Sequence, residues 1–150
     1  MRRRITSTIA VALVLALVVP AAALAGPAQP VTFHGTFSEG TGIGTFYGFP
    51  DPACESGTTS DEFKLGAGFQ SNRKVQLLLD KVFTCAGSGD TFTLQLTVHI
   101  LIGPVYGNHF TWTVVNGTGH LASMRGAGTG SAVPTDEGGL DTYTGQLVFD

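Results

Sequence analysis

The sequence predicts an all-β fold, a single antiparallel barrel of eight strands preceded by an N-terminal signal helix. Apolar and polar residues alternate through most of the chain, as in strands that bury one face. After residue 26, no stretch of ten residues shows the 3.6-residue period of a helix. Clusters of glycine, proline and aspartate separate the alternating stretches, which favours antiparallel pairing of successive strands.

Closing the sheet removes its exposed edges, and eight strands enclose an interior filled by side chains or one small ligand. A β-sandwich is the alternative fold. An immunoglobulin domain is disfavoured, because Trp112 follows both cysteines instead of lying between them.

The first 25 residues have the layout of a secretory signal peptide. Residues 2–4 are all arginine, and residues 9–19 form an unbroken apolar run of 11 residues. The small residues before Gly26 predict cleavage between Ala25 and Gly26. The run is shorter than the ~20 residues of a membrane span, so no stable membrane anchor is expected after cleavage.

Residues 26–150 then form one domain, whose predicted strands follow each other in chain order. They are expected within residues 31–38, 43–49, 62–65, 75–83, 91–102, 110–115, 127–133 and 140–149. The stretch 91–102 alternates most strictly, and 127–133 is built from small residues.

The mature chain is acidic, with five basic and 11 acidic residues and a net charge of −6. It has no basic stripe, which argues against nucleic acid and anionic lipid as partners. Cys54 and Cys85 both belong to the mature chain. In an exported protein such a pair predicts a disulfide, and no Cys-x-x-Cys motif supports the alternative of a reactive thiol pair.

Two glycine-rich regions point to a family. The first reads Trp112-Thr113-Val114-Val115-Asn116-Gly117-Thr118-Gly119, followed by Leu121-Ala122 and Arg125-Gly126. It resembles the G-T-G-x-[FY]-x-x-x-x-G region of allene oxide cyclase and dirigent barrels and their small secreted bacterial relatives. Residues 85–94 and 141–147 resemble the same bacterial proteins, so the likeness spans about residues 80–150. Leu121 stands where an aromatic residue is more usual.

This resemblance implies an eight-stranded barrel with an apolar cavity and no metal or organic cofactor. Allene oxide cyclases hold a reactive substrate in that cavity while it cyclises, and dirigent proteins orient phenoxy radicals during coupling. The relatives often assemble as trimers, which leaves a homo-oligomer open here. None of their acid–base residues matches a position of this chain, so no catalytic residue is carried over.

Other cofactor and metal sites are not predicted. The glycines at 117 and 119 imitate a dinucleotide-binding loop, but the helix that such a loop requires is missing. The four histidines, at 34, 99, 109 and 120, lack ligand spacing and are interpreted as solvated.

Four residues are candidates for the wall of a cavity. Lys81 shares the apolar face of its strand, and Tyr143 shares a face with apolar residues near the C-terminus. Phe110 and Trp112 also point with the core. A lysine and a tyrosine in an apolar barrel could bind or polarise a ligand oxygen. The alternative is ordinary packing, with Lys81 reaching water near a strand end.

Two functions remain. The first is a secreted bacterial protein without catalytic activity that binds a small apolar ligand or acts through its surface. The second is a cofactor-free cyclase, isomerase or dirigent-like protein that confines a small hydrophobic substrate. A cavity containing Lys81, or another ionisable group with a strongly shifted pKa, would favour the second function.

Overall fold

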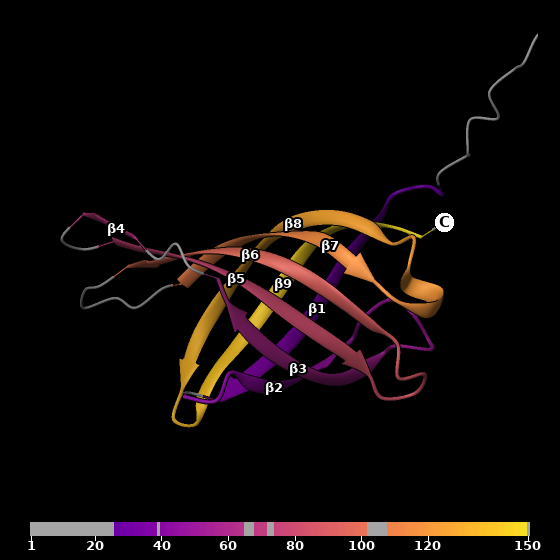
Figure 1. The fold of residues 1–150 in the computed structure, drawn as a ribbon, viewed down its shortest axis with the longest axis horizontal. Helices are drawn as coiled ribbons and strands as arrows, with labels where there is room; N and C mark the ends of the chain where they lie inside the picture. The colour runs from indigo at the N-terminus through magenta and orange to yellow at the C-terminus, as the bar shows by residue number, and fades with distance from the viewer. Residues whose placement is uncertain (1–25, 39, 65–67, 72–73, 102–107, 150) are drawn as a thin grey trace, which may run out of the picture.

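The computed structural model describes residues 26–38, 40–64, 68–71, 74–101 and 108–149, and most of these residues lie in strands. Figure 1 shows them wound around a common axis. Within the described residues there are nine strands and one short 3₁₀-helix. The strands are β1 (Gln29–Ser38), β2 (Ile43–Tyr47), β3 (Ser56–Phe63), β4 (Gly68–Ser71), β5 (Lys74–Cys85), β6 (Thr91–Leu101), β7 (Asn108–Gly117), β8 (Arg125–Thr135) and β9 (Gly138–Val148).

One antiparallel sheet closes on itself to form the barrel. Its strand order is β3-β2-β1-β9-β8-β7-β6-β5-β4, with an additional pairing of β3 with β5. That pairing runs from Gly57 opposite Cys85 to Phe63 opposite Leu79. It joins the two ends of an eight-stranded ring, while the four-residue β4 pairs only with β5. The predicted eight-stranded barrel is therefore confirmed, and the alternative sandwich is excluded.

The strand β3 differs from the prediction, which placed a strand only at residues 62–65. The structure extends it back to Ser56, through a Ser-Gly-Thr-Thr-Ser-Asp run without hydrophobic alternation. Backbone pairing with both β2 and β5 specifies this segment, since each neighbour supplies hydrogen bonds along its length. The predicted strand residue Leu65 lies outside the described residues.

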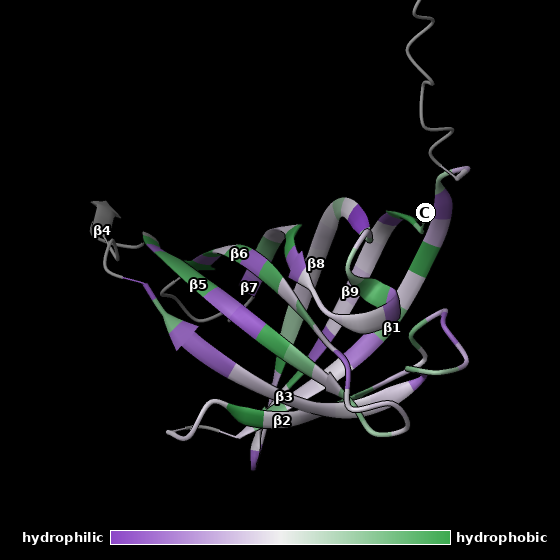
Figure 2. Ribbon diagram, turned by 45° about the vertical axis from the view of Figure 1, so that its right-hand side comes forward, coloured by the Kyte–Doolittle hydropathy of each residue, from purple (hydrophilic) through white to green (hydrophobic). Residues whose placement is uncertain are grey.

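Aromatic side chains fill one half of the barrel interior. Figure 2 shows hydrophobic and hydrophilic segments interspersed along the strands, as expected for walls with one buried face. The Phe83 and Phe92 rings stack at a centroid distance of 4.5 Å, and the Phe33 and Tyr143 rings at 4.6 Å. Phe33 of one stacked pair packs edge-to-face against Phe83 of the other, with ring centroids 5.9 Å apart. This half of the barrel is consequently packed by side chains.

The small residues of β8 and β9 make room for Trp112. A Cβ atom on Gly128 or Gly145 would lie 2.6 or 2.5 Å from the Trp112 ring. The indole nitrogen donates a hydrogen bond to the Thr129 carbonyl at 3.0 Å. Glycine is thus required where the largest side chain of the core meets the wall.

The turn between β7 and β8 closes the packed end of the barrel. It contains the 3₁₀-helix η1 (Gly119–Leu121), and Leu121 and Met124 are buried. Gly119 has a φ of +55°, and a Cβ on Gly117 would lie 2.1 Å from the Leu121 carbonyl oxygen. Turn geometry therefore accounts for the glycines that imitate a nucleotide-binding loop.

A disulfide also secures this end. Cys54 and Cys85 are bonded and buried, which confirms the predicted pair. The predicted signal peptide, with its cleavage residue Ala25, lies outside the described residues, which begin at Gly26. No helix in the described ranges has the length and apolar character needed to cross a bilayer.

Candidate functional site

The barrel end opposite η1 holds a pocket of about 490 Å³, here called the mouth pocket. β6 spans both ends, since it begins near Phe92 in the aromatic half and reaches the pocket at Ile100. The pocket extends to the surface, because the exposed residues Ser38 and Phe63 contribute to its wall. Its lining residues are Phe37, Ser38, Gly40, Thr41, Gly42, Asp61, Phe63, Leu77, Leu79, Lys81, Leu96, Val98, Ile100, Asn108, Phe110, Ala132 and Asp141.

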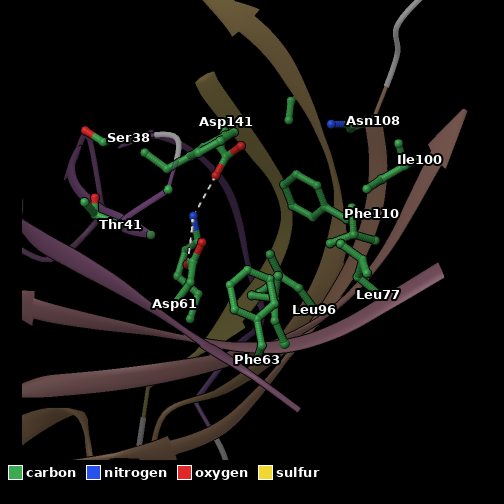
Figure 3. A pocket seen from close by; sticks show the side chains of 17 residues that line it. Ser38, Thr41, Asp61, Phe63, Leu77, Leu96, Ile100, Asn108, Phe110 and Asp141 are labelled. Atoms are coloured by element: carbon green, nitrogen blue, oxygen red, sulfur yellow. Dashed lines mark hydrogen bonds and ion pairs between the residues drawn. The ribbon is translucent and has the colours of Figure 1, made fainter. Parts of the chain in front are cut away.

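Lys81, Asp61, Asp141 and Tyr143 form a buried ion cluster at one side of this pocket. Figure 3 labels its two aspartates, Asp61 and Asp141. The Lys81 Nζ is 2.9 Å from Asp141 Oδ2 and 3.3 Å from Asp61 Oδ1. The Tyr143 hydroxyl donates a hydrogen bond to the same Asp141 Oδ2 at 2.9 Å. The side chains of Lys81, Asp141 and Asp61 are only 3%, 5% and 9% exposed.

Strand alternation and register bring the buried ion cluster together. Lys81 lies on β5 between Leu79 and Phe83 at period two, so its side chain turns inward with theirs. Asp61 is the direct cross-strand partner of Lys81 in the β3–β5 pairing that closes the barrel. Asp141 and Tyr143 share the inner face of β9, two residues apart. The cluster therefore depends on barrel closure as well as on local sequence.

The charges in the buried ion cluster are unequal, with one ammonium group facing two carboxyl groups. Burial raises the pKa of Asp61, the Lys81 charge opposes that rise, and the Asp141 charge adds to it. Burial and the neighbouring Asp141 carboxylate hold the pKa of Tyr143 well above 10.0, so its hydroxyl remains a donor. Asp61 Oδ1 is buried, and in the described part of the chain it has the ion pair with Lys81 at 3.3 Å but no hydrogen bond of good geometry. Of the two aspartates in the cluster, Asp61 therefore has the weaker hydrogen bonding.

The predicted cavity residues take different positions. Lys81 and Phe110 line the mouth pocket. Tyr143 is not a lining residue, but it donates a hydrogen bond to Asp141, which is one. Trp112 lies in the aromatic core next to Phe33 and does not line the mouth pocket. The alternative in which Lys81 reaches water is wrong, because inward alternation leaves it 3% exposed.

Sequence reasoning missed the two aspartates. Asp141 carried a usable signal, since it precedes Tyr143 by two residues and therefore shares its face. Asp61 lacked one, because the polar run before it does not reveal which face turns inward. The carboxylates also change the chemistry expected of Lys81 and Tyr143, whose polar atoms already bind Asp141.

A second charged group lies at the packed end, around His120. Its Nε2 is 3.0 Å from Asp51 Oδ2, and its Nδ1 contacts Asp90 Oδ2. His120 is exposed, as the interpretation of solvated histidines expected, and it also pairs with these two carboxylates. The hydrogen bond to Asp90 raises the pKa of His120, and the same bond lowers the pKa of Asp90. No cluster of the described residues has the geometry of a metal site.

Replacing His120 with glutamine is expected to cost more stability at pH 5.5 than at pH 8.5. A raised folded-state pKa makes the His120 contribution fully present below the unfolded value of about 6.5 and lost as pH rises through the folded value. The lowered Asp90 pKa preserves the carboxylate partner down to its own acid range. Thermal unfolding of both proteins at the two pH values measures the difference, with exposed His109→Gln as the control. Equal losses at both pH values would contradict the ion-pair interpretation.

No family model, no curated protein and no solved structure matches this chain. The likeness to allene oxide cyclase and dirigent barrels is therefore one of motif. What the mouth pocket does is inferred from its own residues, an apolar wall beside the buried ion cluster.

Proposed function

We propose that this protein is a secreted, non-catalytic barrel that binds a small, largely apolar ligand in the mouth pocket. The carrying observation is the pocket itself, about 490 Å³ of space in a barrel whose other half is packed by aromatic rings. Ligand sites commonly have volumes of about 300–1,000 Å³, with apolar walls and a few polar groups.

The wall of the mouth pocket favours an apolar ligand body. Six of its apolar residues come from three consecutive strands: Leu77, Leu79, Leu96, Val98, Ile100 and Phe110. Covering such side chains with ligand stabilises the complex by about 25 cal/mol for each Å² of apolar surface removed from water. The polar side chains of the lining are Lys81, Asp61 and Asp141 of the buried ion cluster, together with Ser38, Thr41 and Asn108.

An extracellular location is supported by two features. The N-terminal residues predict an exported chain, with the arginine-rich and alanine-rich character of a bacterial signal peptide. The Cys54–Cys85 disulfide suits an oxidising compartment. Native mass spectrometry of the protein from its own culture medium measures the mass of any retained ligand and the oligomeric state together.

The binding proposal is tested by narrowing the mouth pocket. Val98→Trp places an indole in the pocket, whereas Val115→Trp adds the same ring at an exposed position of β7. Titration with the neutral fluorophore N-phenyl-1-naphthylamine is expected to give saturable 1:1 binding. We expect Val98→Trp to weaken it by at least about tenfold through loss of apolar contact area, and Val115→Trp to leave it unchanged. Absence of saturable binding to the unmodified protein would refute the proposal.

A cofactor-free isomerase or cyclase is the second candidate function. The observation that favours it is Asp61, a carboxyl group in the pocket wall whose pKa is raised by burial. Such a group can transfer a proton to or from a confined substrate. The two functions differ in what happens to a molecule recovered from the pocket. A catalyst converts it to an isomer of equal mass and loses this activity in Asp61→Asn, whereas a binding protein returns it unchanged.

A further inference from the structure

The mouth pocket is chemically two-sided. In Figure 3, Asp61 and Asp141 lie on the side of Ser38 and Thr41, while Ile100 and Phe110 lie on the other side. The polar side contains the buried ion cluster, and the other side is formed by strands β5 to β7, whose lining residues there are apolar apart from Asn108. A ligand that matches both sides has one polar end and an apolar body.

The polar side has an excess of negative charge. Lys81 is the single cation of the buried ion cluster and is already engaged by both aspartates. Its closer contact is Asp141, at 2.9 Å against 3.3 Å for Asp61. The Asp61 side chain is 91% buried, and in the described structure Oδ1 has the Lys81 ion pair at 3.3 Å but no well-formed hydrogen bond. A buried carboxylate oxygen is stabilised by each further donor, so a hydrogen bond from a ligand would add to this single long contact.

These observations distinguish three possible polar groups of a ligand: an anion, a neutral hydroxyl and a protonated amine. An anionic end would face two carboxylates with no uncommitted cation in the described pocket wall. A neutral hydroxyl would supply a hydrogen bond but leave the excess charge. A protonated amine supplies both, and aromatic rings close to the cluster suit a cation, since Phe37 already lies 5.4 Å from the Lys81 nitrogen. The net charge of −6 on the mature chain also attracts cations.

We propose that the mouth pocket selects lipophilic amines, with the ligand's protonated nitrogen on Asp61 and its apolar body against β5, β6 and β7. This inference rests on the proposed binding function and specifies its ligand class. It also gives the buried ion cluster a role, because such clusters add little net stability compared with apolar packing.

The inference is tested with three probes of equal chain length: octylamine, 1-octanol and octanoate. By isothermal titration calorimetry at pH 7, we expect the affinity for octylamine to exceed that for 1-octanol at least about tenfold, and octanoate to bind most weakly. The factor corresponds to the gain from one charge-assisted hydrogen bond. In Asp61→Asn, octylamine is expected to bind no more tightly than 1-octanol. Glu62→Gln removes the same charge from the next residue of β3, an exposed one, and is expected to retain the ranking.

A pH comparison keeps the test independent of the folding of the Asp61 variant. Lowering the pH from 7 to 4 protonates Asp61, so octylamine affinity is expected to fall while 1-octanol affinity stays constant. Lys81, Asp141 and Tyr143 are the ionisable groups facing Asp61 in the described structure, and the raised pKa of Tyr143 keeps its hydroxyl protonated across this range. Equal binding of octylamine and 1-octanol at pH 7 overturns the amine inference but leaves apolar binding intact. Failure of all three probes, and of the neutral fluorophore, overturns both.

Discussion

Replacing Lys81 with methionine is expected to lower the free energy of unfolding by about 3–5 kcal/mol at pH 7. Methionine keeps an unbranched side chain in the interior but removes the only cation facing Asp61 and Asp141 in the described structure. Two buried carboxyl groups are then left without their counter-charge, and desolvation disfavours ionising either one. The loss is measured by denaturant unfolding of the variant and the unmodified protein.

The pH dependence and a matched control identify the cause of this loss. Burial raises the pKa of Asp61, and its protonation removes an uncompensated charge, so the stability difference is expected to shrink between pH 7 and pH 4. The control is Lys64→Met, because the Lys64 side chain is 46% exposed and its buried partner Asp80 still accepts a hydrogen bond from Gln95 without it. That change is expected to cost about 0–1 kcal/mol. Similar losses for the two lysine variants would contradict a special role for the buried ion cluster.

Removing the disulfide is expected to cost about 3–4 kcal/mol, the value of the chain-entropy model for a loop of this length. Cys54 and Cys85 are 31 residues apart, and the bond limits the freedom of the unfolded chain between them. The double variant Cys54→Ala/Cys85→Ala tests this by denaturant unfolding against the oxidised protein.

Dithiothreitol supplies the control for the disulfide prediction. It should lower the stability of the unmodified protein towards that of the double variant and leave the double variant unchanged. A loss below 1 kcal/mol would show that the unfolded chain is already restricted without the bond.

The sequence predicted the barrel strands because the alternation that reveals them is a property of neighbouring residues. The alternation of stretch 91–102 identifies an inner and an outer face from spacing alone, and β6 has those faces. The same rule placed Lys81 inward beside Leu79 and Phe83. It did not identify β3, where a polar run becomes a strand because two neighbours pair with it.

The candidate site was predicted in part for the same reason. Phe110 and Lys81 were found from their registers, and both line the mouth pocket. Asp61 was missed, since 20 residues separate it from Lys81 in the chain and only the β3–β5 pairing sets them opposite each other. Asp141 lies 60 residues from Lys81 and meets it across the barrel interior.

The amino-acid sequence by itself determined the all-β class, the faces of most strands and the cysteine pair, because alternation and turn composition are properties of neighbouring residues. The tertiary structure alone decided which end of the barrel is packed, where the mouth pocket lies and which charges meet inside it. These depend on register and closure, which bring residues from β3, β5 and β9 to one point. The chemistry of Lys81 therefore changed from that of an isolated lysine to that of one cation between two carboxylates.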